Sequence, residues 1–133
     1  MSETPKSVNP LGWPRPIGFS NAMIAEGKIV AIAGQIGWDP ITEELVSADF
    51  VQQSRQALAN VISSLEAAGG KPQNLVRLTW YLTDRTEYLS HLKELGAAYR
   101  EEVGSYYPAM SVVIVAGLLE EGAKVEIEAL AVL

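Results

Sequence analysis

Residues 49–70, DFVQQSRQALANVISSLEAAGG, and residues 76–83, VRLTWYLT, decide the fold of this chain. Asp49 can accept hydrogen bonds from the free amides of a first helical turn, and Gln52 completes a capping box. Small and apolar residues then recur at helical spacing: Phe50, Ser54, Ala57, Leu58, Val61, Leu65 and Ala68. Gly69 ends the helix. The β-branched and aromatic residues that follow predict a strand.

A second helix is predicted directly after this strand. Asp84 caps its first turn. Apolar side chains again recur at helical spacing: Leu89, Leu92, Leu95, Tyr99 and Val103. Gly104 ends this helix. Apolar runs at residues 110–116 and 124–133 predict two further strands joined by a loop.

The segment before the first helix is richer in turns. Residues 20–25 and 28–33 predict a hairpin, and residues 34–44 are expected to break any regular element. Residues 1–18 contain four prolines, Pro5, Pro10, Pro14 and Pro16. We therefore expect an extended, irregular arm at residues 1–18 and a single domain at residues 19–133.

The predicted order is β-β-α-β-α-β-β, an α+β domain whose two helices cover one face of a sheet. The strand at 110–116 is nevertheless apolar on both faces, since Met110 and Val112 alternate with Ser111 and Val113. A strand with one face in water would alternate cleanly between apolar and polar residues. The pattern predicts a homo-oligomer that covers the second face, although an unusually apolar exposed sheet gives the same pattern.

Composition excludes several classes of function. The chain has 133 residues, a formal charge of −6, 48% hydrophobic residues, one histidine and no cysteine. These values exclude thiolate chemistry and argue against multi-histidine metal sites, so we expect neither a metal nor a cofactor. The acidic balance argues against a nucleic-acid partner. We expect no membrane partner and a cytoplasmic location, because no secretory signal is recognisable and the longest apolar run, Val112 to Leu119, is short.

The strongest candidate for chemistry is the pair Glu126 and Glu128. The period of a strand places both carboxylates on one face, roughly 7 Å apart along the chain. Leu130 and Val132 continue that face, so the carboxylates are partly desolvated and suited to acid–base work. The alternative is a strand whose first half faces water and whose second half is buried.

Single residues elsewhere are weaker candidates. His91, on the second predicted helix, is expected at the boundary of the core or on the surface. Trp13 and Trp38 fall in predicted loops and can wall an apolar pocket, whereas Trp80 falls on a strand and is expected in the core.

Several spaced motifs together resemble one family, the Rid/YjgF family of imine deaminases, also called L-PSP endoribonucleases or translation inhibitors. The motifs are FSNAM (19–23), AGQIG (33–37), QQSRQALANVISSLEAAGG (52–70), LTWYLTD (78–84), YPAMS (107–111) and VEIEALAV (125–132). The resemblance covers nearly the whole chain. It implies a chorismate-mutase-like fold that assembles as a homotrimer, with clefts between neighbouring subunits.

The resemblance also assigns roles to the motif residues. In deaminating members, an arginine before the serine of the YPAMS-like motif binds the substrate carboxylate. A glutamate at the first acidic position of the last motif positions the water or proton that hydrolyses the imine. Glu126 matches that glutamate, and Glu128 the second acidic position. Met110 stands where the arginine is expected, and a thioether cannot replace a charged, bidentate guanidinium.

Other positions of the implied cleft have changed in the same direction. Phe19 stands at the place of a pocket tyrosine, and Leu92 at the place of a helix asparagine. These two residues are expected to contact the substrate, together with Met110, Ser111, Glu128 and Trp38. Arg15, on the proline-rich arm, is a candidate to replace the missing arginine across an interface.

Two functions follow from this cleft. In the first, Glu126 is a general acid–base in a hydrolase that acts on an imine, enamine or related small molecule and works poorly on simple 2-imino acids. In the second, the protein is a non-catalytic trimer that binds or senses a small metabolite. An endoribonuclease is disfavoured, because the charge of −6 and the single histidine provide neither an RNA track nor a histidine pair.

Overall fold

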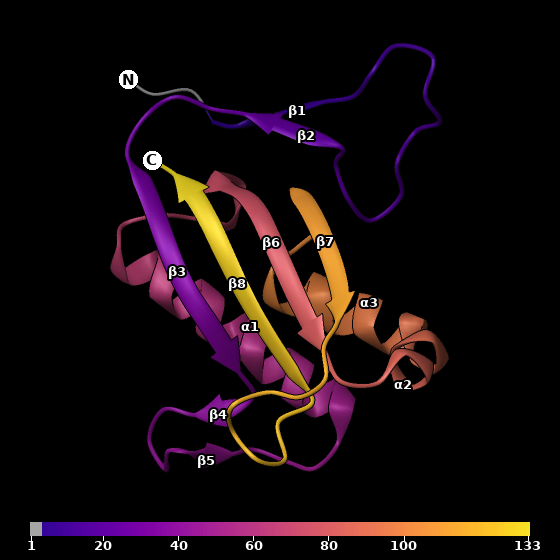
Figure 1. The fold of residues 1–133 in the computed structure, drawn as a ribbon. Helices are drawn as coiled ribbons and strands as arrows, with labels where there is room; N and C mark the ends of the chain where they lie inside the picture. Colours follow the sequence, from indigo (N-terminus) through magenta and orange to yellow (C-terminus); the bar gives the residue numbers. More distant parts are fainter. Residues whose placement is uncertain (1–3) are drawn as a thin grey trace.

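A four-stranded sheet lies at the centre of the structure, a computed structural model that describes residues 4–133 (Figure 1). Its strands are, in spatial order, β3 (Ile29–Ile36), β8 (Val125–Val132), β6 (Leu75–Leu82) and β7 (Ala109–Ile114). β7 is parallel to β6, and the other neighbouring strands are antiparallel. The strands predicted at 76–83, 110–116 and 124–133 are therefore confirmed, with small differences at their ends.

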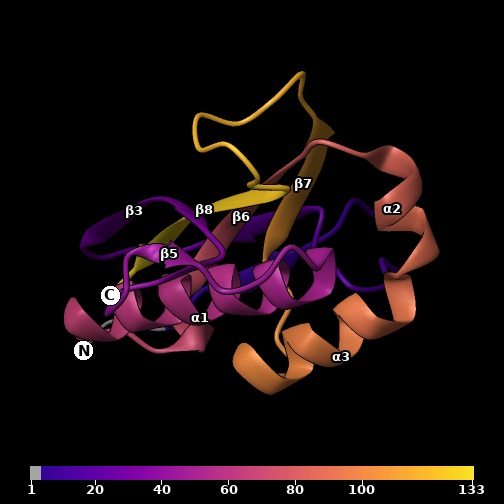
Figure 2. The same cartoon turned by 90° about the horizontal axis from the view of Figure 1, so that it is seen from below.

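Helices α1 (Phe50–Ala67) and α3 (Leu92–Glu102) cover one face of the sheet (Figure 2). The short helix α2 (Arg85–Ser90) precedes α3, and a 3-10 turn, η1, spans Pro72–Asn74. The predicted α+β class is confirmed. In the described part of the chain, no helix is long and apolar enough to cross a membrane.

The two aspartates cap their helices as predicted, but Gln52 does not complete a capping box, because the backbone N–H of Asp49 donates to Ser47 Oγ over 2.9 Å. The backbone N–H of Gln52 donates to the Asp49 carboxylate, and that of Glu87 donates to Asp84, both over 3.0 Å. Gly69 adopts a left-handed conformation, with φ of 91°, directly after the cap of α1. Local signals therefore fixed both helix starts and the end of α1.

The second predicted helix is wrong in one respect, because it is two helices that meet at His91. The ring Nδ1 of His91 lies 2.7 Å from the Glu87 carbonyl oxygen, which a continuous helix would offer to the backbone N–H of His91. That N–H donates to the Tyr88 carbonyl instead, and His91 leaves helical geometry with φ of −127° and ψ of 25°. The side chain thus competes with the helical ladder.

The core fills the space between the sheet and the two longer helices. On β8, Val125, Ile127, Ala129 and Ala131 are buried against it, and Trp80 of β6 is buried there as predicted. Its largest fully buried apolar side chains are Leu58, Leu65, Leu75, Leu78, Leu82 and Ile127. We call the opposite surface of the sheet the open face, because no helix of the described chain covers it (Figure 2). Ile29, Val113 and Leu130 are exposed there.

The predicted hairpin of residues 20–33 is wrong. β2 (Ala22–Ile24) pairs instead with β1 (Lys6–Val8), and β3 pairs with β8. The turn at Gly27 brings the chain against Leu133, and Lys28 and Leu133 exchange two backbone hydrogen bonds of 2.8–2.9 Å. Pairing with β8 satisfies the backbone hydrogen-bonding groups of β3, so β2 pairs with β1 instead.

The predicted irregularity of the proline-rich arm is wrong in part, because strand β1 lies within the arm. Residues 1–3 of the arm lie outside the described part of the chain. Between Pro5 and Pro10 every residue carries a backbone N–H, so a three-residue strand can pair.

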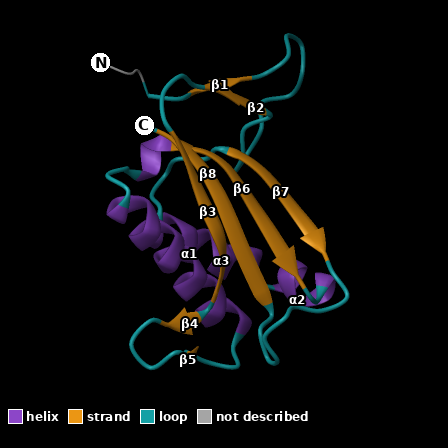
Figure 3. Cartoon of the chain, turned by 60° about the vertical axis from the view of Figure 1, so that its left-hand side comes forward, coloured by secondary structure: helices purple, strands orange, loops and turns teal. Residues whose placement is uncertain are grey.

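Regular structure also continues where residues 34–44 predicted none. β3 runs through Gly34 to Ile36 across a register shift, and β4 (Trp38–Asp39) then pairs with β5 (Glu44–Leu45). The Asp39 carboxylate accepts a hydrogen bond of 2.8 Å from the backbone N–H of Ile41 and closes the turn. Figure 3 shows this small hairpin at the end of the sheet where β3 finishes.

Candidate functional site

Glu126 lies on the open face where β8 begins, between two adjoining hollows. The first hollow, of about 340 Å³, is bounded by the β4–β5 hairpin, and the second, of about 390 Å³, by the loop after β7. Gly34, Leu119 and Glu126 line both of them. Glu126 is therefore the acidic side chain common to both hollows.

Two features of the sheet place the Glu126 carboxylate. The strand period points Glu126 and Glu128 away from the core, as predicted. On the neighbouring strand, Gly34 leaves room for the carboxylate, because a Cβ at that position would lie 2.7 Å from Glu126 Cδ. Glu126 is half-buried and makes no hydrogen bond or ion pair with the described residues. Its oxygens are available to a ligand.

Gly34→Ala tests this arrangement. The new methyl group is expected to displace the Glu126 carboxylate and lower ligand affinity or turnover at least tenfold. The melting temperature should change little, because the displaced atoms are the far end of a flexible side chain. Ligand titration and thermal unfolding measure the two effects. Unchanged function in Gly34→Ala would contradict the close approach.

Gly37→Ala is the matched control. A Cβ there would lie 2.5 Å from Gln53 Cα and 2.6 Å from its carbonyl oxygen. The backbone of Gln53 cannot move aside as the end of a side chain can. Gly37→Ala should therefore lower the melting temperature, whereas Gly34→Ala should leave it almost unchanged.

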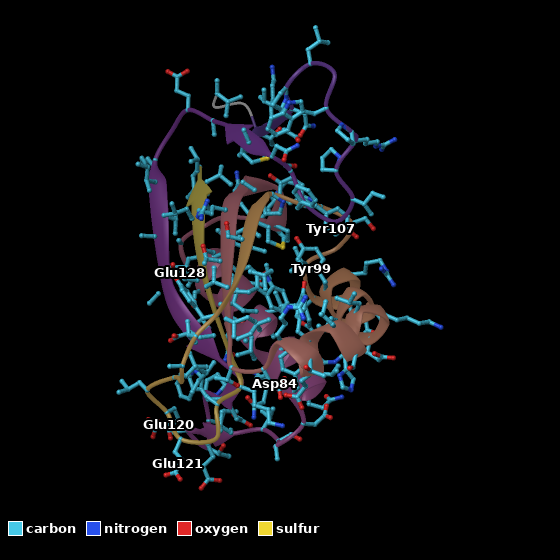
Figure 4. The ribbon with its side chains drawn as sticks, turned by 45° about the vertical axis from the view of Figure 1, so that its right-hand side comes forward. Asp84, Tyr99, Tyr107, Glu120, Glu121 and Glu128 are labelled. Carbon is cyan, nitrogen blue, oxygen red and sulfur yellow. The ribbon has the colours of Figure 1, made fainter. Side chains whose placement is uncertain are left out.

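The first hollow combines apolar walls with negative charge. Ile36, Trp38, Leu45 and Leu119 supply the apolar and aromatic surface. Glu43 and Glu120 join Glu126 as carboxylates, and no basic side chain is among the lining residues. Glu120 lies in the loop between β7 and β8 (Figure 4). Such a pocket favours a ligand with an apolar body and a neutral or cationic polar group.

The second hollow holds a tyrosine that sequence reasoning missed. Tyr81 of β6 lies opposite Glu126 of β8, and its hydroxyl donates a hydrogen bond to Glu128. The hydrogen bond to Glu128 and, second, desolvation raise the pKa of Tyr81 above its usual value. Strand period alone places Tyr81 on one face of β6, but only the register with β8 brings it to the glutamates.

Arg77 is the basic side chain that the structure places further along this face of β6. Its guanidinium donates to Thr79 Oγ1 and to Ser111 Oγ, both over 3.2 Å. Ser111, a predicted substrate contact, therefore lies beside Arg77 and not in the hollows around Glu126.

Two other predicted residues, Phe19 and Arg15, line a separate hollow of about 380 Å³ near β1 and β2. The neighbouring Ser20 holds Phe19 in place. The backbone N–H of Ser20 donates to the Pro108 carbonyl, and the Ser20 hydroxyl donates to the Tyr107 carbonyl. Tyr107, another lining residue, stacks on Tyr99 with ring centroids 5.1 Å apart (Figure 4). Strands β1 and β2, which contribute Ser7 and Met23 to this hollow, lie at the opposite end of the sheet from the β4–β5 hairpin (Figure 1).

A sequence model of the family described as Endoribonuclease L-PSP matches residues 14–133. The chain belongs to this family, the Rid/YjgF family. It is 37% identical over 118 residues to a RutC family protein of Pyrococcus horikoshii, covering 89% of this chain and 90% of the relative. It is 35% identical over 120 residues to the 2-iminobutanoate/2-iminopropanoate deaminase of Capra hircus, covering 90% of this chain and 83% of that enzyme.

Among solved structures, the chain resembles a Rid family protein of unknown function, YyfB, from Yersinia pestis. The TM-score is 0.87 at 31% identity, and the match covers 98% of this chain and all of that one (100%). The resemblance drawn from the sequence motifs is therefore confirmed at the level of family and fold.

Within this Rid/YjgF chain, the last two predicted contacts lie away from Glu126. Met110 is in register with the buried Leu78 and packs half-buried against the core. Leu92 is exposed at the first turn of α3. One chain therefore brings Trp38 to Glu126 and Phe19 to Arg15, but it does not bring these two pairs together. The described residues contain no cluster of His, Asp and Glu that could hold a metal ion.

Proposed function

We propose that this Rid/YjgF protein is a small-molecule hydrolase that acts on an imine or enamine and works poorly on simple 2-imino acids. The observation that carries the proposal is the unpartnered Glu126 carboxylate in a hollow with apolar and acidic walls and no basic side chain among its lining residues. A substrate carboxylate would meet Glu43, Glu120 and Glu126 there with no cation to bind it.

In the proposed reaction, Glu126 accepts a proton from a water molecule as the water oxygen bonds to the imine carbon. Glu126 then returns this proton to the nitrogen, which gives a carbinolamine. Glu126 next takes the proton of the carbinolamine hydroxyl and delivers it to the nitrogen as the carbon–nitrogen bond breaks, so that ammonia leaves and the carbonyl forms. The products of the imine and one water are thus a carbonyl compound and ammonia. Glu126 ends in its starting state, as a general acid–base does.

The complete site is proposed to lie between copies in a homotrimer. The hollow with Phe19 and Arg15 and the hollow with Glu126 lie at opposite ends of one sheet, so two copies are needed to join them. The exposed apolar residues of the open face support association, because monomeric proteins rarely leave large apolar patches in water.

The test compares two imines: 2-iminopropanoate, which carries a carboxylate, and the imine of benzaldehyde, which is neutral. An assay for released ammonia measures the hydrolysis of each. We expect kcat/KM to be at least tenfold higher for the neutral imine once the uncatalysed rates are subtracted. A preference for 2-iminopropanoate would contradict the proposed specificity. Binding of the neutral imine without turnover would instead favour the binding or sensing protein.

Met110→Arg completes this experiment. A guanidinium that reaches the cleft should raise kcat/KM for 2-iminopropanoate more than tenfold, and the gain should disappear in Met110→Arg/Glu126→Gln. Because Met110 packs against the core, thermal unfolding must first establish that the variant folds. No gain in a folded variant would mean that the cleft differs from the family's in more than this arginine.

A further inference from the structure

The two glutamates of the open face differ in their partners. Both belong to β8 and point to the same side of the sheet, and both line the second hollow. Glu128 accepts a hydrogen bond from the Tyr81 hydroxyl, whereas Glu126 accepts none from the described residues. The period of the strand does not distinguish the two carboxylates, but their contacts do.

We propose that Tyr81 is a positioning residue that engages Glu128 and leaves Glu126 as the carboxylate that meets the ligand. This inference rests on the proposed function for the nature of the ligand. Without a donor, Glu128 would face the same hollow as Glu126, and both carboxylates would compete for one positive or hydrogen-bond-donating group.

The surroundings of Tyr81 make it the donor. A phenol is protonated throughout the neutral range, and the hydrogen bond to Glu128 raises the pKa of Tyr81 further, so the hydroxyl has a proton to donate. From β6, the Arg77 charge lowers this pKa, and from β8, the charges of Glu126 and Glu128 raise it. Arg77 is directed toward Thr79 and Ser111, and no ion pair joins it to either glutamate. The walls contributed by the loop after β7 are apolar: Val115, Leu118 and Leu119.

Tyr81 also lies close to both Glu126 and Glu128. In the register of β6 with β8, Tyr81 lies opposite Glu126 and Thr79 lies opposite Glu128. The hydroxyl therefore reaches diagonally to the more distant glutamate. That contact draws the Glu128 carboxylate toward β6, while Glu126 lies over Gly34 of β3.

A double-mutant cycle tests the proposal, with benzylammonium as the probe and calorimetry as the readout. With Tyr81 present, Glu126→Gln should weaken binding at least tenfold, because the probe loses its charged partner. In a Tyr81→Phe background, the released Glu128 can turn to the probe, so Glu126→Gln should weaken binding less than threefold. Equal factors in the two backgrounds would overturn the proposal, since independent sites are additive. Failure of the probe to bind would also overturn it.

A second measurement reads the contact itself. The ultraviolet difference between the wild type and Tyr81→Phe isolates the ionisation of Tyr81 from that of the other tyrosines. In Glu128→Leu, Tyr81 should ionise at lower pH, because the largest cause of its raised pKa is gone. An unchanged titration would refute the hydrogen bond. Tyr88→Phe, which removes a half-buried hydroxyl on α2, is the matched control and should alter neither measurement.

The outcomes separate this inference from the proposed function. Coupling between Tyr81 and Glu126 without hydrolysis of any imine would contradict the function and support the role of Tyr81. Hydrolysis that depends on Glu126, together with an additive cycle, would support the function and contradict the role of Tyr81.

Discussion

Glu126→Gln is expected to lower the rate of imine hydrolysis by about 10²–10⁴-fold, the usual contribution of a general acid–base. The amide keeps the size of the side chain and can still accept a hydrogen bond, but it cannot take a proton from water. The loss should therefore appear in kcat, with little change in the KM of a neutral imine. Steady-state kinetics with ammonia detection measures both constants.

Glu43→Gln and Glu120→Gln are the matched controls, since both carboxylates line the first hollow but not the second. Each should keep kcat within about threefold of the wild type. If either variant loses as much kcat as Glu126→Gln, the total negative charge of the hollow matters and Glu126 has no separate role in proton transfer. If Glu126→Gln keeps full activity, Glu126 has no role in proton transfer.

Gln53→Leu should have the largest effect on stability among the polar residues. Gln53 is fully buried on α1, and its side-chain amide donates to the carbonyls of Ser47 and Gly122 over 2.9 and 3.0 Å. Its side-chain oxygen accepts from the backbone N–H of Lys124 over 2.8 Å. Leucine fills a similar volume but leaves three backbone groups without partners. At about 0.5–1.5 kcal/mol for each of these three hydrogen bonds, the free energy of unfolding should fall by roughly 1.5–4.5 kcal/mol.

Urea unfolding measures this loss, and Gln52→Leu is the control. Gln52 is the preceding residue of the same helix and is exposed, so its replacement should change the free energy of unfolding by less than about 0.5 kcal/mol. A loss below about 1 kcal/mol in Gln53→Leu would show that water replaces the missing partners. The loop that ends at Lys124 also lines both hollows, so ligand binding should weaken before the fold is lost.

The sequence predicted best those elements whose signals are local. Asp49, Asp84 and Gly69 act within one helical turn of their own positions, and each acts as expected. The partner of β2 could not be predicted in this way. It depends on the competition between a nearby strand and the distant C-terminal strand for β3, and that competition is a property of the assembled sheet.

The same distinction applies to the candidate site. The common face of Glu126 and Glu128 follows from strand period, and the structure has it. Gly34 and Tyr81 approach the two glutamates only through the registers of β3 and β6 with β8, which one sequence does not reveal. The resemblance to the family named Met110 and Leu92, but neither lines the hollows around Glu126 in the structure of one chain.

The three tryptophans lie in three different environments, and this makes the protein its own optical reporter. Trp80 is 5% exposed in the core, Trp13 is 59% exposed on the arm, and Trp38 lines the first hollow. Emission from Trp80 will move to longer wavelength when the core opens. Quenching of Trp38 will follow occupancy of the hollow, with Trp13 as a constant background. Folding and ligand binding can thus be followed in one cuvette without a label.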